Sequence, residues 1–348
     1  MKRIIHFIAT AIVLMTACNK TEPAPEQEQY DKYIFFSSGV ETKAELIGDK
    51  SDLDGESFGV VGYKYPNNLT WDQYKQSTPA PTPNVFYGTG TNTVNVEDVK
   101  CDANGLGSYA PLQGWSNTKK YTFFAFYPSP SGNKYVTLVN TTPAIRYSVN
   151  TTDLKASMVD LMIDPTSHKD LTSASNGVNN GNVSFNFQHC LSALGINVIN
   201  SSSATIILKS ATISVSGLKY KDLTINLDEG TVSKTSENLA HQSLSLAIPD
   251  DGQTVLSNKE DEVSDKLIFI PQYEQGEDVS VEVTVTYTRK LNGYPDFEGE
   301  ATISGLATKL SQGYKHLVNL KFTESTVVVD EFQHMGWSTI PKVEDTFN

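Results

Sequence analysis

Histidine and cysteine are the side chains that most readily act as nucleophiles, general bases or metal ligands near neutral pH. The chain has three cysteines and six histidines, and none of them forms an HExxH or CxxC arrangement. His189 and Cys190 are sequence neighbours, but adjacent residues of a strand point to opposite faces, which argues against a Cys/His dyad. The remaining histidines are scattered at His6, His168, His241, His316 and His334. The protein is therefore not predicted to be an enzyme.

Carboxylates gather in two short stretches, SDLDGES at Ser51–Ser57 and NKEDEVSD at Asn258–Asp265. The first lacks the spacing and the terminal glutamate of a calcium loop, and the second is typical of a solvated loop. Gly88 and Gly90 are not followed by the rest of any phosphate-binding motif. We therefore expect no metal site and no cofactor.

Three aromatic residues, Trp71, Tyr74 and Trp115, could stack on sugar rings if they were exposed. Buried aromatic side chains are the commoner arrangement in a β-sandwich. A surface protein that binds a glycan or a host ligand is kept as an alternative function.

Charge and cysteine content limit the partners and the compartment. The formal net charge is −13, and the chain has no block of Lys and Arg. Nucleic-acid binding needs a basic footprint, so we predict no nucleic-acid partner. Cys101 and Cys190 could pair outside the cell, but two buried free thiols are favoured because a chain this long needs no covalent staple.

Residues 1–17 have the plan of a secretory signal peptide: Lys2 and Arg3, a short apolar run to Met15, and small residues before Cys18. The run is far shorter than the ~20 residues of a membrane span. A cysteine directly after small residues indicates a lipoprotein signal, with Cys18 lipidated, although Met15 stands where leucine is usual. The alternative is an ordinary signal followed by a chance cysteine. Residues 18–29, rich in Pro, Glu and Gln, are predicted to be a flexible tether.

The rest of the chain is patterned as β-strands. VSVEVTVTYT (Val279–Thr288) alternates apolar and polar residues, as a half-buried strand does. Only short segments near Trp71 and Met158 have helical character, so many short strands with turns between them predict β-sandwiches. The polar stretch Pro165–Asn182 is typical of an inter-domain connection. We predict an N-terminal domain at residues 30–178 and a C-terminal domain at 179–348.

The stretch YIFFSSGVETKAEL, Tyr33–Leu46, places core residues directly after the tether. Strand alternation predicts that Ile34 and Phe36 point into the first domain, while Tyr33 and Phe35 face the other side. The strand is followed by an isolated base, Lys43, before the small residue Ala44.

The order of these motifs resembles the fimbrillin-like lipoproteins of Bacteroidales, which are subunits of type V pili. The resemblance covers essentially the whole mature chain. It is carried by Cys18, ETKAEL, FGVVGYKY, YTFFAFYP (Tyr121–Pro128), VSFNFQHCLSALGINV, IFIPQ (Ile268–Gln272), GYKHLVNLKFT (Gly313–Thr323) and Trp337.

The resemblance implies two tandem transthyretin-like β-sandwich domains and assembly by strand exchange. In this family, as the resemblance implies for this chain, a lipid-anchored precursor reaches the cell outer membrane, and a surface trypsin-like protease removes the leader with the first strand. Removal of that strand opens a hydrophobic groove, which a strand from another pilus subunit then fills. Carried onto this sequence, the displaced strand holds Ile34 and Phe36, and the cleaved bond is Lys43–Ala44. The donor candidates are Val327 and Val329 in Ser325–Ile340.

One departure from the family pattern concerns the cleaved bond. The resemblance implies processing at arginine, yet no arginine lies between Arg3 and Arg146. Either a protease that accepts lysine acts at Lys43, with Lys50 as a nearby alternative, or the subunit stays uncut. An uncut subunit would remain lipid-bound, as an anchor does, and a tip subunit is the other role outside the stalk.

Overall fold

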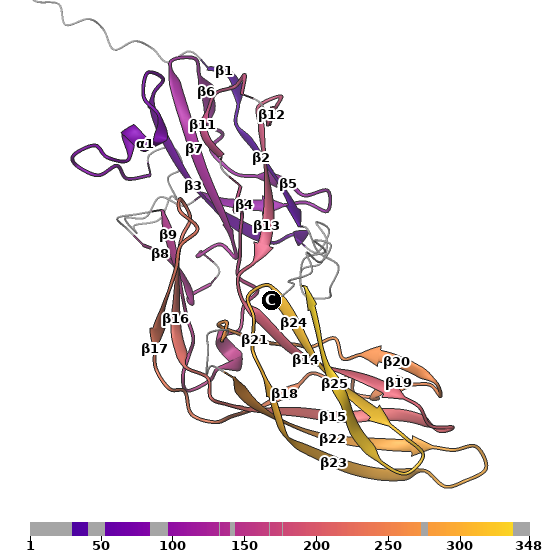
Figure 1. Ribbon diagram of the computed structural model, residues 1–348. Helices are drawn as coiled ribbons and strands as arrows, with labels where there is room; N and C mark the ends of the chain where they lie inside the picture. The colour runs from indigo at the N-terminus through magenta and orange to yellow at the C-terminus, as the bar shows by residue number, and fades with distance from the viewer. Residues whose placement is uncertain are drawn as a thin grey trace, which may run out of the picture.

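The computed structural model describes residues 30–40, 53–83, 97–131, 133–139, 143–166, 168–175, 177–272 and 278–336. These segments are mostly strands, arranged in two lobes with a smaller sheet along one side (Figure 1). The predicted all-β class is confirmed. Within these residues no helix has the length and apolar character that a membrane crossing requires.

The first lobe is built on a nine-stranded sheet that closes on itself, because β10 pairs with both β13 and β7. A separate two-stranded sheet lies beside it, formed by β1 (Tyr30–Tyr33) and β6 (Gly114–Ser116). The nine strands, in spatial order, are β10 (Met162–Ile163), β13 (Asn182–His189), β2 (Phe35–Val40), β5 (Leu106–Ser108), β4 (Glu97–Cys101), β3 (Ser57–Pro66), β7 (Lys119–Tyr127) and β11 (His168–Leu171), with β12 (Val178–Asn179) on β13.

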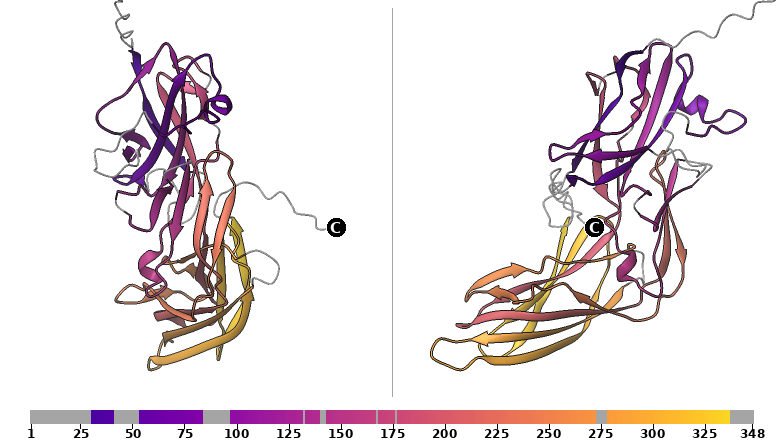
Figure 2. Two further views of the ribbon diagram at one scale, coloured as in Figure 1. Left: turned by 90° about the vertical axis from the view of Figure 1, so that its left-hand side faces the viewer. Right: turned by 180° about the vertical axis from the view of Figure 1, so that it is seen from behind.

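The second lobe is a sandwich of two five-stranded sheets (Figure 2). One contains β20 (Lys259–Glu262), β14 (Ser192–Asn200), β24 (Tyr314–Phe322) and β25 (Val327–Gly336), with β21 (Leu267–Phe269) on β14. The other contains β18 (Gln242–Leu246), β15 (Thr205–Ser216), β22 (Val279–Lys290) and β23 (Phe297–Thr308), with β19 (Gln253–Val255) on β15.

The strand pairing runs across residue 178, where the sequence pattern places the domain boundary. β13 follows that position yet belongs to the first sheet, whereas β14, three residues further along, belongs to the second lobe. A four-stranded sheet also joins the two halves of the chain: β17 (Val232–Ser236), β16 (Tyr220–Asn226), β9 (Ala144–Ser148) and β8 (Val136–Val139). The boundary at 178 stays a prediction.

Strands β3 and β7 are buried on both faces, which explains their nearly continuous apolar runs. Phe58 and Phe123 point into a core enclosed by the closed sheet. Tyr63 and Phe124 point the other way, into a larger core shared with the second lobe. The rest of the protein therefore covers the outer face of the first sheet at β3 and β7.

Both predicted helical segments are present but short. Helix α1 (Trp71–Tyr74) is preceded by its N-cap Thr70, whose side chain and that of Gln73 form a reciprocal capping box. The segment near Met158 contains a 3₁₀ turn (Lys155–Ser157).

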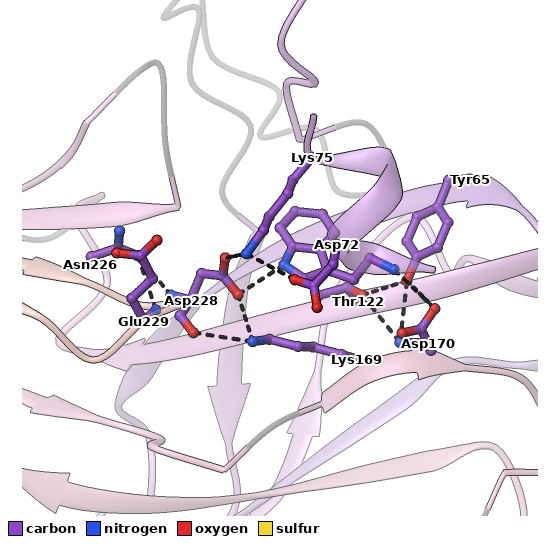
Figure 3. A network of polar contacts seen from close by, with 10 residues as sticks. Tyr65, Asp72, Lys75, Thr122, Lys169, Asp170, Asn226, Asp228 and Glu229 are labelled. Carbon is purple, nitrogen blue, oxygen red and sulfur yellow. Dashed lines mark hydrogen bonds and ion pairs between the residues drawn. The ribbon is translucent and has the colours of Figure 1, made fainter. Parts of the chain in front are cut away.

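A buried carboxylate links α1 and β11 to the β16–β17 turn (Figure 3). Asp228 accepts the indole N–H of Trp71 at 2.8 Å and pairs with Lys75 at 2.9 Å and with Lys169 at 2.6 Å. Its side chain is only 6% exposed. Burial alone would raise its pKa, but the hydrogen bonds from Lys169, Lys75 and Trp71 outweigh burial and hold the pKa below its ordinary value.

Candidate functional site

The candidate site is the place that β2 occupies in the first sheet. β2 lies between two neighbours, parallel to β13 and antiparallel to β5, with Phe36 opposite Val183 and Gly107. It is an interior strand, although it comes from the very start of the described chain. Its removal would split the closed sheet between β13 and β5.

The inward side chains of β2 belong to the enclosed core of the first lobe. Ile34 is 0% exposed and Phe36 is 1% exposed, whereas Tyr33 is 55% exposed and Phe35 is 39% exposed. The orientation expected from strand alternation is therefore the one observed. Burial of two such side chains contributes roughly 1.5–3 kcal/mol each, so β2 stabilises the lobe while it stays in place.

Three rings surround the phenyl group of Phe36. Its centroid lies 5.4 Å from those of Phe123 and Phe185 and 5.6 Å from that of Tyr109. The Phe123 ring meets it edge-on, and the Phe185 ring stacks on it. This pocket is shaped for a flat aromatic group.

The end of β2 makes polar contacts instead. Ser38 is buried, and its hydroxyl lies 3.3 Å from Sγ of Cys101 and 3.4 Å from the carbonyl oxygen of Gly105. The side-chain amide of Asn182 donates to Oγ of Ser37 at 2.8 Å. Burial raises the pKa of the Cys101 thiol, which keeps it protonated. Positions 37 and 38 of β2 therefore accept small hydroxyl side chains.

Backbone groups anchor the beginning of the strand. The Ile34 N–H donates to Gln113 at 2.8 Å, the Phe35 N–H donates to Gly181 at 3.0 Å, and the Tyr109 hydroxyl donates to the Ile34 carbonyl at 2.7 Å. Without β2, these partners and the facing edges of β13 and β5 would lose their hydrogen bonds. An apolar furrow lined by unpaired backbone groups is a ready acceptor for another strand.

Several predicted site residues lie outside the described residues. These are Cys18 in segment 1–29, and Lys43 and Ala44 in segment 41–52. The strand β2 ends at Val40, three positions before Lys43.

The donor candidates Val327 and Val329 lie in β25, at the edge of one sheet of the second lobe. They pair with Phe322 and Leu320 of the neighbouring strand β24. Both are half-buried and pack against the larger core. In this structure both residues therefore belong to an edge strand of a sheet in their own chain.

The aromatic residues that motivated a glycan-binding alternative are mostly buried. Trp71 is 2% exposed and Trp115 is 0% exposed. Tyr74 is half-buried and stacks on Tyr65 at 4.8 Å. The three side chains do not form an exposed aromatic surface, so this observation removes the support for stacking on sugars.

The two cysteines in the described part are free and buried, as the sequence favours. Cys190 lies in the larger core, and Cys101 lies in the enclosed core. His189 does not face its neighbour Cys190 as a dyad; its Nδ1 lies 2.6 Å from Asp160. Among the described residues, no three His, Cys, Asp or Glu side chains are grouped to hold a metal ion.

Sequence patterns missed the polar pairs that the fold assembles. Asp160 with His189, Asp228 with Lys75 and Lys169, and His316 with His334 are each separated by many positions in the chain. No spacing rule predicts such pairs, because their partners meet only after the sheets form.

A family model described as fimbrillin-like matches residues 69–337, which is most of the chain. The chain belongs to the fimbrillin-like family. The matched range includes the later motifs on which the resemblance rests, from Tyr121–Pro128 to Trp337, whereas Cys18, ETKAEL and FGVVGYKY precede it.

Solved structures share the fold of this fimbrillin-like chain. A fimbrial protein from Bacteroides vulgatus is 20% identical, with a TM-score of 0.55, over 87% of this chain and 99% of that one. A candidate cell adhesion protein from Bacteroides ovatus is 13% identical, with a TM-score of 0.50, over 89% and 98%. Among curated proteins, none matches the chain.

Proposed function

We propose that the protein is a structural subunit of a type V cell-surface pilus, assembled by removal of β1 and β2 and insertion of a strand from the next subunit. The observation that carries this proposal is the position of β2. In chain order it is the first strand of the nine-stranded sheet, and it lies between β13 and β5 with Phe36, and Ile34 just before it, in the core. Membership of the fimbrillin-like family supports the role of a pilus subunit.

The physical argument starts from what the cut would expose. Loss of β2 leaves an apolar furrow and two unpaired strand edges, and both favour uptake of another extended segment. The donor segment and the furrow lie at different places on the subunit. Such a contact is heterologous, so it repeats from subunit to subunit and forms a filament.

The precursor is proposed to be held at the outer membrane by lipid on Cys18 and to be cut by a surface trypsin-like protease at Lys43–Ala44. The short interval from Val40 to Lys43 supports this bond, because a cut there would free the whole of β2. The names of the two solved relatives, one fimbrial and one a candidate for cell adhesion, support a pilus that takes part in adhesion.

Limited trypsin digestion of the full chain, followed by N-terminal sequencing and electron microscopy, tests the proposal. We expect a new N-terminus at Ala44, loss of residues 30–40 from the product, and filaments. Lys43→Gln should abolish both the cut and the filaments, whereas the matched variant Lys50→Gln should leave them unchanged.

Two outcomes would contradict the stalk role. A trimmed protein that stays monomeric would exclude strand exchange between copies. A mature protein from cells that still begins at a lipidated Cys18 would indicate an uncut anchor instead. A tip subunit would accept a strand from another subunit without passing one on.

A further inference from the structure

The first two inward positions of β2 set a requirement on any strand that replaces it. Position 34 is enclosed by apolar side chains, and Ile34 is fully buried there. Position 36 lies among the rings of Phe123, Phe185 and Tyr109. A replacement strand therefore needs an apolar residue followed, two positions later, by an aromatic one.

The next two positions require hydroxyl groups. Ser37 accepts a hydrogen bond from Asn182, and Ser38 is buried beside the Cys101 thiol and the carbonyl oxygen of Gly105. A carboxylate at position 38 would be desolvated next to a carbonyl oxygen, which strongly disfavours it there. Positions 34–38 therefore define a template: apolar, any, aromatic, hydroxyl, hydroxyl.

We propose that Met335–Thr339 of one subunit occupies positions 34–38 of the next. This inference rests on the proposed function, because it names the strand that enters the furrow. The segment reads Met-Gly-Trp-Ser-Thr, which satisfies every position of the template in the same chain direction as Ile-Phe-Phe-Ser-Ser. The aromatic residues of segment 325–348 are Phe332, Trp337 and Phe347.

Neither of the other two aromatic residues fits, because Asp330 stands two positions before Phe332 and Asp345 two positions before Phe347. Each would place a carboxylate in the buried position 34. Trp337 is larger than the ring it replaces, and the half-buried Tyr109 at the rim of the pocket is the side chain that would shift.

The template also excludes the registers that use Val327 and Val329. If Val327 took position 34, Glu331 would fall on the buried hydroxyl site at position 38. If Val327 took position 36 instead, an aliphatic group would replace the ring, and Val329 would displace the hydroxyl. In both registers a buried polar partner loses its hydrogen bond, which disfavours them relative to the proposed register.

Release of the donor is also easier from the end of β25 than from its beginning. Val327, Val329 and Phe332 pack against the larger core, so freeing them would expose that core. Met335 and Gly336 form only the last two pairs of the β24–β25 ladder, with Lys315 and Tyr314. The proposed donor can therefore leave while most of β25 stays in its own sheet.

A disulfide cross-link distinguishes the registers, because position 38 lies against Cys101. In the full chain carrying Thr339→Cys, trypsin trimming and mild oxidation should give a ladder of disulfide-linked chains on a non-reducing gel. Mass spectrometry should show the introduced thiol at position 339 joined to Cys101. Glu331→Cys and Val329→Cys, the controls for the Val327 registers, should give no cross-link above the untrimmed background. Adding Cys101→Ala to Thr339→Cys should remove the ladder.

The possible failures are separable. If trimmed wild-type protein forms no polymer, the proposed function and this inference both fail. If it polymerises but the thiol introduced by Thr339→Cys links only within one chain, or the ladder appears with Glu331→Cys or Val329→Cys instead, only this inference is overturned. A synthetic peptide of residues 333–341 should also inhibit polymerisation of the trimmed wild type at least about tenfold better than one of residues 325–333, since tenfold corresponds to only ~1.4 kcal/mol. Equal inhibition would likewise overturn the register.

Discussion

His316 and His334 face each other across β24 and β25, with their Nδ1 atoms 2.7 Å apart. The backbone N–H of Ser311 donates to Nε2 of His316 at 3.0 Å, so that nitrogen accepts and the proton of the neutral ring lies on Nδ1. Nδ1 of His316 therefore donates to Nδ1 of His334. The pair is satisfied while both rings are neutral, and a proton added to Nε2 of His316 would displace the hydrogen bond from Ser311.

Acid should weaken the fold through this pair. Burial, and then the neighbouring His334, lower the pKa of His316 from 6.5 to about 4. Asp278, Lys309 and Tyr314 line the same cavity. His316 binds a proton more tightly in the unfolded chain than in the folded protein. Its contribution to the free energy of unfolding is therefore complete above pH ~6.5 and is lost as the pH drops towards ~4, by on the order of 1–3 kcal/mol. Urea unfolding at pH 7 and pH 5 measures this loss.

His316→Gln tests this prediction, and His241→Gln is the control, because the His241 side chain is exposed. His316→Gln should be less stable at pH 7 and should lose less stability between pH 7 and pH 5 than wild type. His241→Gln should keep the wild-type difference. An unchanged pH dependence in His316→Gln would contradict the assignment to this pair.

Asp228→Asn should destabilise the protein, because it leaves Lys75 and Lys169 without the charge that they face. We expect a loss of about 1–3 kcal/mol at pH 7, since the carboxylate is buried while the lysines are partly exposed. Asp72→Asn is the control: it removes a 74%-exposed partner of the same Lys75 and should cost under about 1 kcal/mol. Thermal unfolding of both variants gives the comparison.

The pKa of Asp228 is held below its ordinary value, so its contribution is present at neutral pH and is lost as the pH falls through that lowered pKa. Asp228→Asn should therefore flatten the acid limb of the stability profile below pH ~4. Equal acid sensitivity in both proteins would argue against the charged network of Figure 3.

Phe36→Ala should destabilise the untrimmed protein by about 3–5 kcal/mol, because it empties a pocket lined by three rings. Phe35→Ala, on the same strand but 39% exposed, should cost under about 1 kcal/mol. Denaturant unfolding checks both values. After trypsin trimming, the two variants should polymerise at the wild-type rate, because the altered strand is gone; a slower Phe36→Ala product would show that the strand is retained.

Gly181→Ala should loosen the first strand specifically. Gly181 has φ +87°, and a methyl group there would lie 2.4 Å from the carbonyl oxygen of Tyr33. Gly177 has the same φ but open space around it, so Gly177→Ala reports the backbone cost alone, about 1–2 kcal/mol. We expect Gly181→Ala to lose a further ~1 kcal/mol or more and to be trimmed by trypsin faster. Equal trimming rates would contradict a role for this contact.

Local patterns were sufficient for the strands themselves. The alternation in Val279–Thr288 and the apolar runs of Ser57–Pro66 and Lys119–Tyr127 all correspond to strands, and the segment near Trp71 with helical character forms a short helix. Burial of Ile34 and Phe36 also follows from alternation alone. Such features depend on backbone geometry over a few residues, which a sequence displays directly.

The assignment of strands to sheets followed no local pattern. β13 and β14 follow each other in the chain, yet they lie in different sheets, and β9 pairs with the distant strand β16, with Ser148 opposite Asp222. Pairing of this kind is decided by which edges and apolar faces meet in three dimensions.

The sequence by itself determined an all-β, fimbrillin-like chain whose first strand carries core side chains just ahead of Lys43, because composition, alternation and motif order are properties of the chain alone. Only the tertiary structure decided that this strand lies between β13 and β5, that rings surround Phe36 while Ser37 and Ser38 make hydrogen bonds, and that the Asp228 and His316 contacts form. Those features belong to neighbours distant in sequence, and their energies exist only once packing has removed water and brought the partners within contact distance.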